Sequence, residues 1–275
     1  MSKSLSIFKN AFLSMLLIVP MMFMFAACDQ LDTQASFKKD ANYAESDAAT
    51  FEAVATDEAV KANDSYRLTV KVKMDATKFI TEMNKYLPES EQKATTDAKA
   101  EMTLNAIVTK DAIAIKMTGA MMSGSEKEKI NGSIYVADGK MYLDGSLGDE
   151  AVSKEYIELA ASADLSDALS EIGMDKWFSQ IDPATIVAEA KASGDITVSA
   201  NGNHFKLEYN VESLPSTLFI NFDKNGVFEG MQAEMSAELF GIAMETTVTI
   251  SGFDGKIDLP NFSGYKKVDS LDSGE

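Results

Sequence analysis

Alternation of apolar and polar residues is the feature that most constrains the fold of this chain. Residues 66–74 divide into two alternating sets, apolar Leu68, Val70 and Val72 and polar Arg67, Thr69, Lys71 and Lys73. Because successive side chains of a β-strand point to opposite sides, this segment is predicted to be a strand with one apolar face and one wet face.

The same alternation recurs over most of the chain. Further strands are predicted over residues 102–108, 113–117, 130–136, 141–143, 196–198, 205–209, 218–222, 227–239 and 242–250. Turn-forming residues separate neighbouring strands at residues 109–111, 138–139, 201–203 and 223–226. Asn-Gly and Asp-Gly loops tolerate positive φ and join antiparallel strands. We therefore expect roughly 9–11 antiparallel strands in one curved sheet.

Three stretches are predicted to be helical. Residues 50–62 precede the first strand, residues 75–87 follow it and end before Pro88, and an insertion over residues 150–192 has apolar residues near helical spacing. Within the insertion, Pro183 is expected to open a further helix. The predicted class is α+β and mainly β, with helices covering the apolar face of the sheet.

The N-terminus has the layout of a secretory signal. Lys3 and Lys9 are followed by an almost wholly apolar run from Ala11 to Ala27, and then by Cys28. The segment Phe25-Ala26-Ala27-Cys28 resembles a bacterial lipobox. That resemblance implies cleavage after residue 27 and acylation of Cys28, which anchors the protein to the outer side of a membrane. An uncleaved anchor helix and an ordinary secretory signal remain alternatives.

Composition divides the rest of the chain into four parts and limits its partners. The signal spans residues 1–27, a lipidated cysteine and flexible tether residues 28–49, a single domain residues 50–265, and a polar tail residues 266–275. Removal of residues 1–27, with two lysines and no acid, changes the formal net charge from −18 to −20. Such a charge excludes nucleic acid as a partner and favours a monomer.

Residues for enzymatic or metal chemistry are scarce. His204 is the only histidine and Cys28 the only cysteine, so the usual zinc sites cannot be assembled. A Ser-His-Asp triad could be built only around His204, which has no recognisable nucleophile elbow. The 43 acidic residues supply a carboxylate pair at any spacing by chance, so such pairs carry no information. We expect no enzyme, no metal and no cofactor.

The order of predicted elements resembles the LolA-like superfamily, which includes the LppX and LprG type lipoproteins. A helix over residues 57–63 runs into a strand over residues 65–74, followed by a hairpin meander, a helical insertion and a second meander, over about residues 50–262 in all. The resemblance implies a curved antiparallel half-barrel whose concave face holds an apolar cavity closed by helices. The superfamily also includes periplasmic lipoprotein carriers, which have an arginine in the cavity. Arg67, the only arginine, lies on the polar face of its strand, so that role is not carried over to this chain.

The resemblance and the one-sided strands together predict a ligand site for a lipid or other apolar molecule. Methionines on the apolar faces suit such a site because their side chains are flexible and polarizable. The predicted lining consists of Leu68, Val70, Val72, Met102, Leu104, Ile113, Ile115, Met117, Ile134, Val136, Met141, Leu143, Phe205, Leu207, Leu218, Ile220 and Met235. An ordinary filled core is the alternative, and it corresponds to a protein that contacts or senses another protein of the cell envelope.

Overall fold

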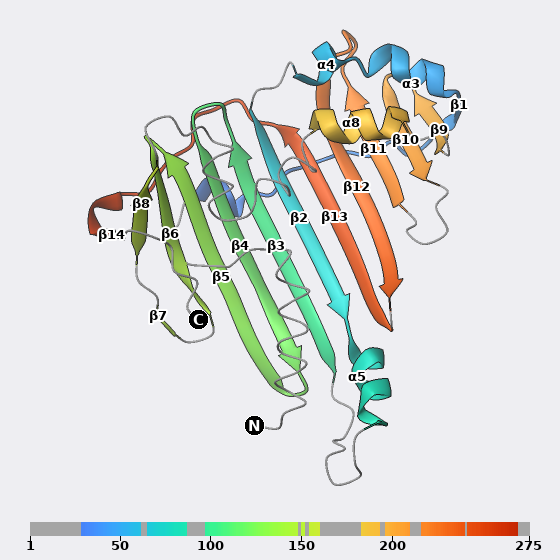
Figure 1. Ribbon diagram of the computed structural model, residues 1–275. Coiled ribbons are helices and arrows are strands. Elements are labelled where there is room, and N and C mark those ends of the chain that lie inside the picture. The colour runs from blue at the N-terminus through green and yellow to red at the C-terminus, as the bar shows by residue number, and fades with distance from the viewer. Residues whose placement is uncertain are drawn as a thin grey trace.

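The computed structural model describes residues 29–61, 65–86, 97–147, 150–151, 154–159, 183–192, 196–209, 216–239 and 241–268. Residues 1–28 and much of the predicted helical insertion lie outside the described residues. The described part is mainly β, and its strands form one open 14-stranded sheet (Figure 1). The prediction of a mainly β chain is therefore confirmed.

The sheet joins two meanders side by side. Its order is β1-β9-β10-β11-β12-β13-β2-β3-β4-β5-β6-β8-β14, with β7 paired to β6. Neighbours are antiparallel except for β14 and β8, which are parallel. The strands are β1 (Ala44–Ser46), β2 (Tyr66–Asp75), β3 (Ala98–Val108), β4 (Ile113–Ser123), β5 (Glu126–Ala137), β6 (Lys140–Leu147), β7 (Glu150–Ala151), β8 (Glu155–Glu158), β9 (Ile196–Asn201), β10 (His204–Tyr209), β11 (Ser216–Phe222), β12 (Phe228–Leu239), β13 (Ile242–Gly252) and β14 (Lys266–Lys267).

The ten long strands, β2–β6 and β9–β13, are those that the alternation predicts, and the count exceeds expectation through four short strands of two to four residues. The tight turns match as well, since Asp138, Gly139, Gly202 and Gly226 all have positive φ. One prediction for the insertion is wrong. Residues 155–158 form β8, which pairs with β6, because an open sheet edge offers this short segment a full set of backbone hydrogen bonds.

The helices are shorter than predicted. They are α2 (Asp29–Asp32), α3 (Ala48–Val54), α4 (Asp57–Lys61), α5 (Thr77–Asn84), α8 (Pro183–Ala192) and the 3₁₀ turn η1 (Phe262–Gly264). The helix predicted over residues 50–62 is divided in two, since the Thr56 hydroxyl accepts a hydrogen bond from Ala59 N–H and caps α4. As predicted, α8 begins at Pro183.

The two faces of the sheet are covered by different parts of the chain, and helices pack on the apolar face. The apolar face carries Leu68, Val70 and Leu104, and its core also contains Phe51 of α3, Val60 of α4 and Val187 of α8. Phe51 packs edge-on against Phe205 with ring centroids 5.3 Å apart. Figure 1 shows these three helices together beside β9–β11. They therefore cover one end of the apolar face.

Two chain segments cross the other side of the sheet, here called the strap face. The N-terminal strap, residues 29–43, is drawn in blue behind the sheet in Figure 1 and leads into β1, which pairs with β9. The C-terminal strap, residues 253–268, ends in β14. With the sheet they form a second core of Leu31, Ile107, Ala114, Tyr135, Tyr142 and Tyr265.

The straps correct two predictions. Residues 29–46 are not a free tether, because Leu31 is fully buried and the backbone of the strap is hydrogen-bonded to the sheet. Lys266 and Lys267, placed in a polar tail, instead form β14. The predicted wet face is also covered in part, and all six buried polar residues lie on it, namely Thr69, Asn105, Ser133, Asp144, Asn221 and Thr249.

Candidate functional site

The residues predicted to line a ligand site all lie on the apolar face. The strand registers place Leu68, Ala106 and Ile115 in one row across β2, β3 and β4, and the other predicted residues fall in parallel rows. Fourteen of the 17 are buried in the main core, Val72 and Met102 are partly buried against it, and Met235 is 41% exposed. Most of the predicted lining is thus core.

On the apolar face, side chains are more deeply buried in one half of each long central strand than in the other. The start of β2 and the end of β13 lie uppermost in Figure 1, and Leu68, Val248 and Ile250, which belong to these upper halves, are buried. In the lower halves, Val72 and Met74 are only partly buried. Figure 1 places α3, α4 and α8 at the upper end, whereas the lower end has only the eight-residue α5, which contacts β13 and β3.

The lower halves carry a group of five methionines, here called the methionine patch: Met74, Met102, Met121, Met235 and Met244. They lie on five neighbouring strands, β2, β3, β4, β12 and β13. Met74 is directly opposite Met244, and Ala100 lies between Met74 and Met121. Met235 and Met244 are 41% and 36% exposed. Glu128 is directly opposite Met121 and supplies a carboxylate at the margin.

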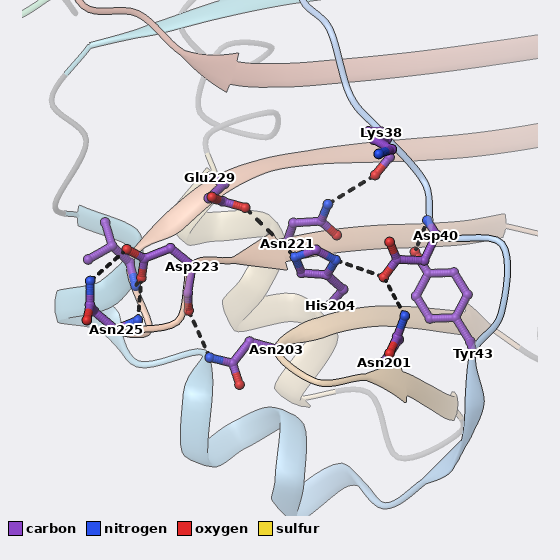
Figure 2. Close-up of polar contacts among 11 residues, drawn as sticks. Lys38, Asp40, Tyr43, Asn201, Asn203, His204, Asn221, Asp223, Asn225 and Glu229 are labelled. Carbon is purple, nitrogen blue, oxygen red and sulfur yellow. Dashed lines mark hydrogen bonds and ion pairs between the residues drawn. The ribbon is translucent and has the colours of Figure 1, made fainter.

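The sole histidine joins the N-terminal strap to the sheet (Figure 2). His204 Nδ1 lies 2.8 Å from Asp40 Oδ2, and Nε2 lies 3.8 Å from Glu229 Oε2. The same Asp40 oxygen accepts a hydrogen bond from Asn201 Nδ2 at 3.1 Å. Both carboxylates are oriented toward the imidazole, and the contact to Asp40 spans two segments far apart in sequence. This geometry serves attachment of the strap.

The strap is held along its length by polar side chains of the sheet. The Arg67 guanidinium donates to the backbone oxygens of Gln30 and Thr33. Asn105 donates to Leu31 O at 2.9 Å, and Thr69 Oγ1 accepts from Ala35 N–H at 2.8 Å. These roles for Arg67, Thr69 and Asn105 were not predicted. The available signal was the large apolar residues at positions 31, 37 and 43 within a polar stretch.

Further along the strap, Asn221 donates to Lys38 O at 3.1 Å. The side chains of Lys39 and Glu234 form an ion pair, and Lys39 Nζ lies 4.3 Å from the centre of the Phe219 ring. Tyr43 packs near the same ring, and burial raises the pKa of its phenol. The strap therefore contacts strands from β4 to β9.

A buried carboxylate secures the C-terminal strap. Tyr265 donates a hydrogen bond of 2.9 Å to Asp144 Oδ2, and Lys154 Nζ lies 3.3 Å from the same oxygen. Burial, followed by the neighbouring Asp144 carboxylate, raises the pKa of Tyr265 well above its usual range. The Tyr142 and Phe262 rings stack beside this pair at 3.6 Å between centroids. The C-terminal strap is fixed by an aromatic cluster around the ion pair of Asp144 and Lys154.

The Asp223–Gly226 segment is a hairpin turn, as predicted. Asp223 Oδ1 accepts hydrogen bonds from the backbone N–H groups of Asn225 and Val227, at 2.7 and 2.8 Å. The bond from Val227, the largest cause, lowers the pKa of Asp223. Among the residues that the structure describes, no group of three or more histidine, cysteine, aspartate or glutamate side chains is arranged to hold a metal ion.

The described residues contain no helix long and apolar enough to span a membrane. The sequence matches no model of a known protein family, and no curated protein matches it.

Proposed function

We propose that the protein is a non-enzymatic, extracytoplasmic lipoprotein, anchored by acylation of Cys28, that binds a lipid or other apolar ligand on its apolar face. The lipobox-like segment before Cys28 supports the anchor. In this proposal the sheet curves as a half-barrel, with α3, α4 and α8 on its concave side. The ligand is transported or sensed, and no metal or cofactor takes part.

The methionine patch is the observation that carries the ligand proposal. Five methionines in two adjacent rows form a mainly apolar surface, interrupted by Thr246 between Met235 and Val72, and two of them are at least one-third exposed. Methionine has three flexible side-chain bonds and a polarizable sulfur, so such a surface adapts to acyl chains of different shape. An acyl chain that covers it gains about 25 cal/mol for each Å² of apolar surface removed from water.

The buried upper halves define where the ligand does not lie. Val70, Ile115 and Leu207 are at most 7% exposed, so their replacement by larger residues tests folding rather than binding. The lower halves are the remaining part of the apolar face. We therefore place the ligand along β12, β13, β2, β3 and β4, with its polar group toward the margin at Glu128.

A photoactivatable palmitate analogue tests the site. The analogue is added to the purified full chain, activated by light, and its attachment sites are mapped by peptide mass spectrometry. We expect labelled peptides to carry residues of the methionine patch. The variant M235E/M244E replaces each exposed methionine by a carboxylate. Each replacement should lower the binding free energy of the analogue by about 1 kcal/mol or more through lost apolar contact, so labelling should fall roughly tenfold or more.

The matched control is M83E/V227E, which introduces the same charges at two other exposed apolar residues, 50% and 39% exposed. Labelling in this control should equal that of the wild type. Equal labelling in both variants would refute the assigned site.

A second function rests on the filled upper core. Fourteen predicted lining residues are buried there with helices α3, α4 and α8, as expected for a protein that uses the sheet as a rigid scaffold. In that case the lipoprotein binds or senses another envelope protein, and no ligand enters. Absence of any labelled peptide in the palmitate experiment would favour this function.

A further inference from the structure

The strap face has a lower half that lies beyond the two straps and carries exposed lysines. Lys71 and Lys73 lie on β2, and Lys127 and Lys129 lie on β5; these four residues are here called the lysine patch. Their side chains share the strap face. Lys71 and Lys73 lie two and four residues after Thr69, which is on that face, and Lys127 is opposite Met122, across from Lys99. All four are exposed. Among the described residues, none has an ion-pair partner within 4.0 Å.

The charge of this area differs in sign from that of the protein. The formal net charge of the chain is −18. On the lower strap face of β2–β5, the lysine patch and Lys99 give five positive charges, against the carboxylates of Asp75, Glu101 and Asp97, of which Asp75 and Asp97 lie beside Lys99. Glu245 on β13, opposite Lys73, is a further acid at the border. A locally basic surface on an acidic protein favours an anionic partner.

The start of the N-terminal strap places the proposed anchor on the same face. Cys28 directly precedes Asp29, the first residue of α2, and Leu31 is fully buried beside Ile107 and Ala114 of β3 and β4. Asp32 forms an ion pair with Lys116 on β4. Because consecutive Cα atoms are about 3.8 Å apart, Cys28 lies within one residue of a helix that is fixed to the strap face.

We propose that the strap face of β2–β5 rests on the anionic phospholipid headgroups of the membrane that holds the anchor. The proposal depends on the acylation of Cys28 proposed above. An acylated Cys28 brings α2 to the bilayer surface without a spacer, and the strands next to α2 follow. Each lysine near such a surface raises the affinity of the protein for the membrane roughly fivefold. The acidic remainder of the protein is repelled.

This orientation has a consequence for the methionine patch. Residues such as Lys73 and Met74 alternate on the same strand, so the two patches occupy opposite faces of the sheet. With the lysine patch on the headgroups, the methionine patch faces away from that membrane. The ligand therefore reaches the patch from the aqueous side.

Lysine acetylation by a water-soluble reagent tests the orientation. The full chain is reconstituted in vesicles of phosphatidylcholine with or without phosphatidylglycerol, and the acetylation rate of each lysine is measured by mass spectrometry. We expect the four lysines of the patch to react at least fivefold more slowly when phosphatidylglycerol is present. High salt should remove the difference because it screens exposed charges. Lys191 on α8 and Lys224 in the β11–β12 turn should react equally in both.

Two variants with the same loss of charge separate the patch from general electrostatics. K127Q/K129Q should abolish much of the protection of Lys71 and Lys73, at roughly fivefold for each lysine removed. K191Q/K224Q should leave that protection unchanged. Equal effects of the two variants would overturn the proposal.

The state of Cys28 is read independently from the mass of the N-terminal peptide. An acylated cysteine with unprotected lysines would refute the membrane contact and keep the anchor. An unacylated cysteine with protected lysines would refute the anchor and keep the contact surface. An unacylated cysteine with unprotected lysines would overturn both.

Discussion

Replacement of Leu31 by alanine is the most direct test of the N-terminal strap as part of the fold. The Leu31 side chain is fully buried and packs in the second core with Ile107, Ala114 and Tyr135. Leucine-to-alanine changes at such sites cost about 2–5 kcal/mol, depending on how far the cavity collapses. The helix that carries Leu31 has only four residues, so it has little stability of its own.

The loss of unfolding free energy in L31A cannot exceed the free energy that holds the N-terminal strap on the sheet. If α2 detaches before the sheet unfolds, the cost equals the free energy that holds the strap, including the bond from Asn105 to Leu31 O. Detachment then exposes Asn105 and Thr69, which also bond to each other at 2.8 Å. Their side chains are hydrated on release, so the sheet survives and the strap becomes cleavable.

Urea unfolding followed by circular dichroism, together with limited proteolysis, distinguishes these cases. We expect either a loss of about 2–5 kcal/mol in the free energy of unfolding or new cleavage between residues 29 and 43. The control is V227A, at a residue 39% exposed, which should change the free energy by less than about 0.5 kcal/mol. L31A with a change as small as the control and no new cleavage would show that residues 29–43 are a tether after all.

Two further changes test the contact between β3 and β4 and the buried pair of the C-terminal strap. A Cβ at Gly119 would lie 2.6 Å from Glu101 O and 3.2 Å from Met102 Cα, so G119A should cost about 1–3 kcal/mol in urea unfolding, whereas G264A, with nothing within 4 Å, should be tolerated. Y265F removes the hydrogen bond to buried Asp144 and should cost about 1.5–3 kcal/mol at neutral pH. Because burial raises the pKa of Tyr265, the folded state keeps this proton above about pH 10, where the unfolded tyrosine loses it. Stability should therefore fall as pH rises above that value, by up to about 1.4 kcal/mol per pH unit, and this slope should be smaller in Y265F. Equal alkaline slopes in the two proteins would contradict the assignment.

The sequence predicts the strands well because their alternation is local. β2 is observed over Tyr66–Asp75, nearly as predicted. β5 begins at Glu126, earlier than the predicted Ile130, because its first residues alternate Glu and Lys and carry no apolar signal. Pairing of β13 with β2, which joins the meanders, connects residues almost the whole domain apart, such as Val248 and Val70. No local pattern reports such a contact.

The strap was not predictable from composition for a similar reason. Residues 29–46 are polar, and their attachment depends on backbone groups bonded to Arg67, Thr69 and Asn105 in another part of the chain. The same contacts explain why strand residues expected to face water are buried. His204 likewise gains its nearest charged partner, Asp40, from the strap. The apolar face was predicted correctly, but which of its ends the helices cover depends on tertiary packing.

The division of the strands into two halves separates residues fixed by packing from residues free to serve another purpose. In the upper halves both faces are buried, so Leu68 and Thr69 are each constrained by neighbours. In the lower halves Lys73 is exposed and Met74 is only partly buried, and core packing does not dictate a lysine or a methionine there. The exposed apolar side chains, and the lysines that have no ion-pair partner among the described residues, are therefore better explained by contacts outside the domain. Because a shift of one residue in register would exchange the two patches, the packed upper halves also keep the apolar and basic surfaces on opposite sides.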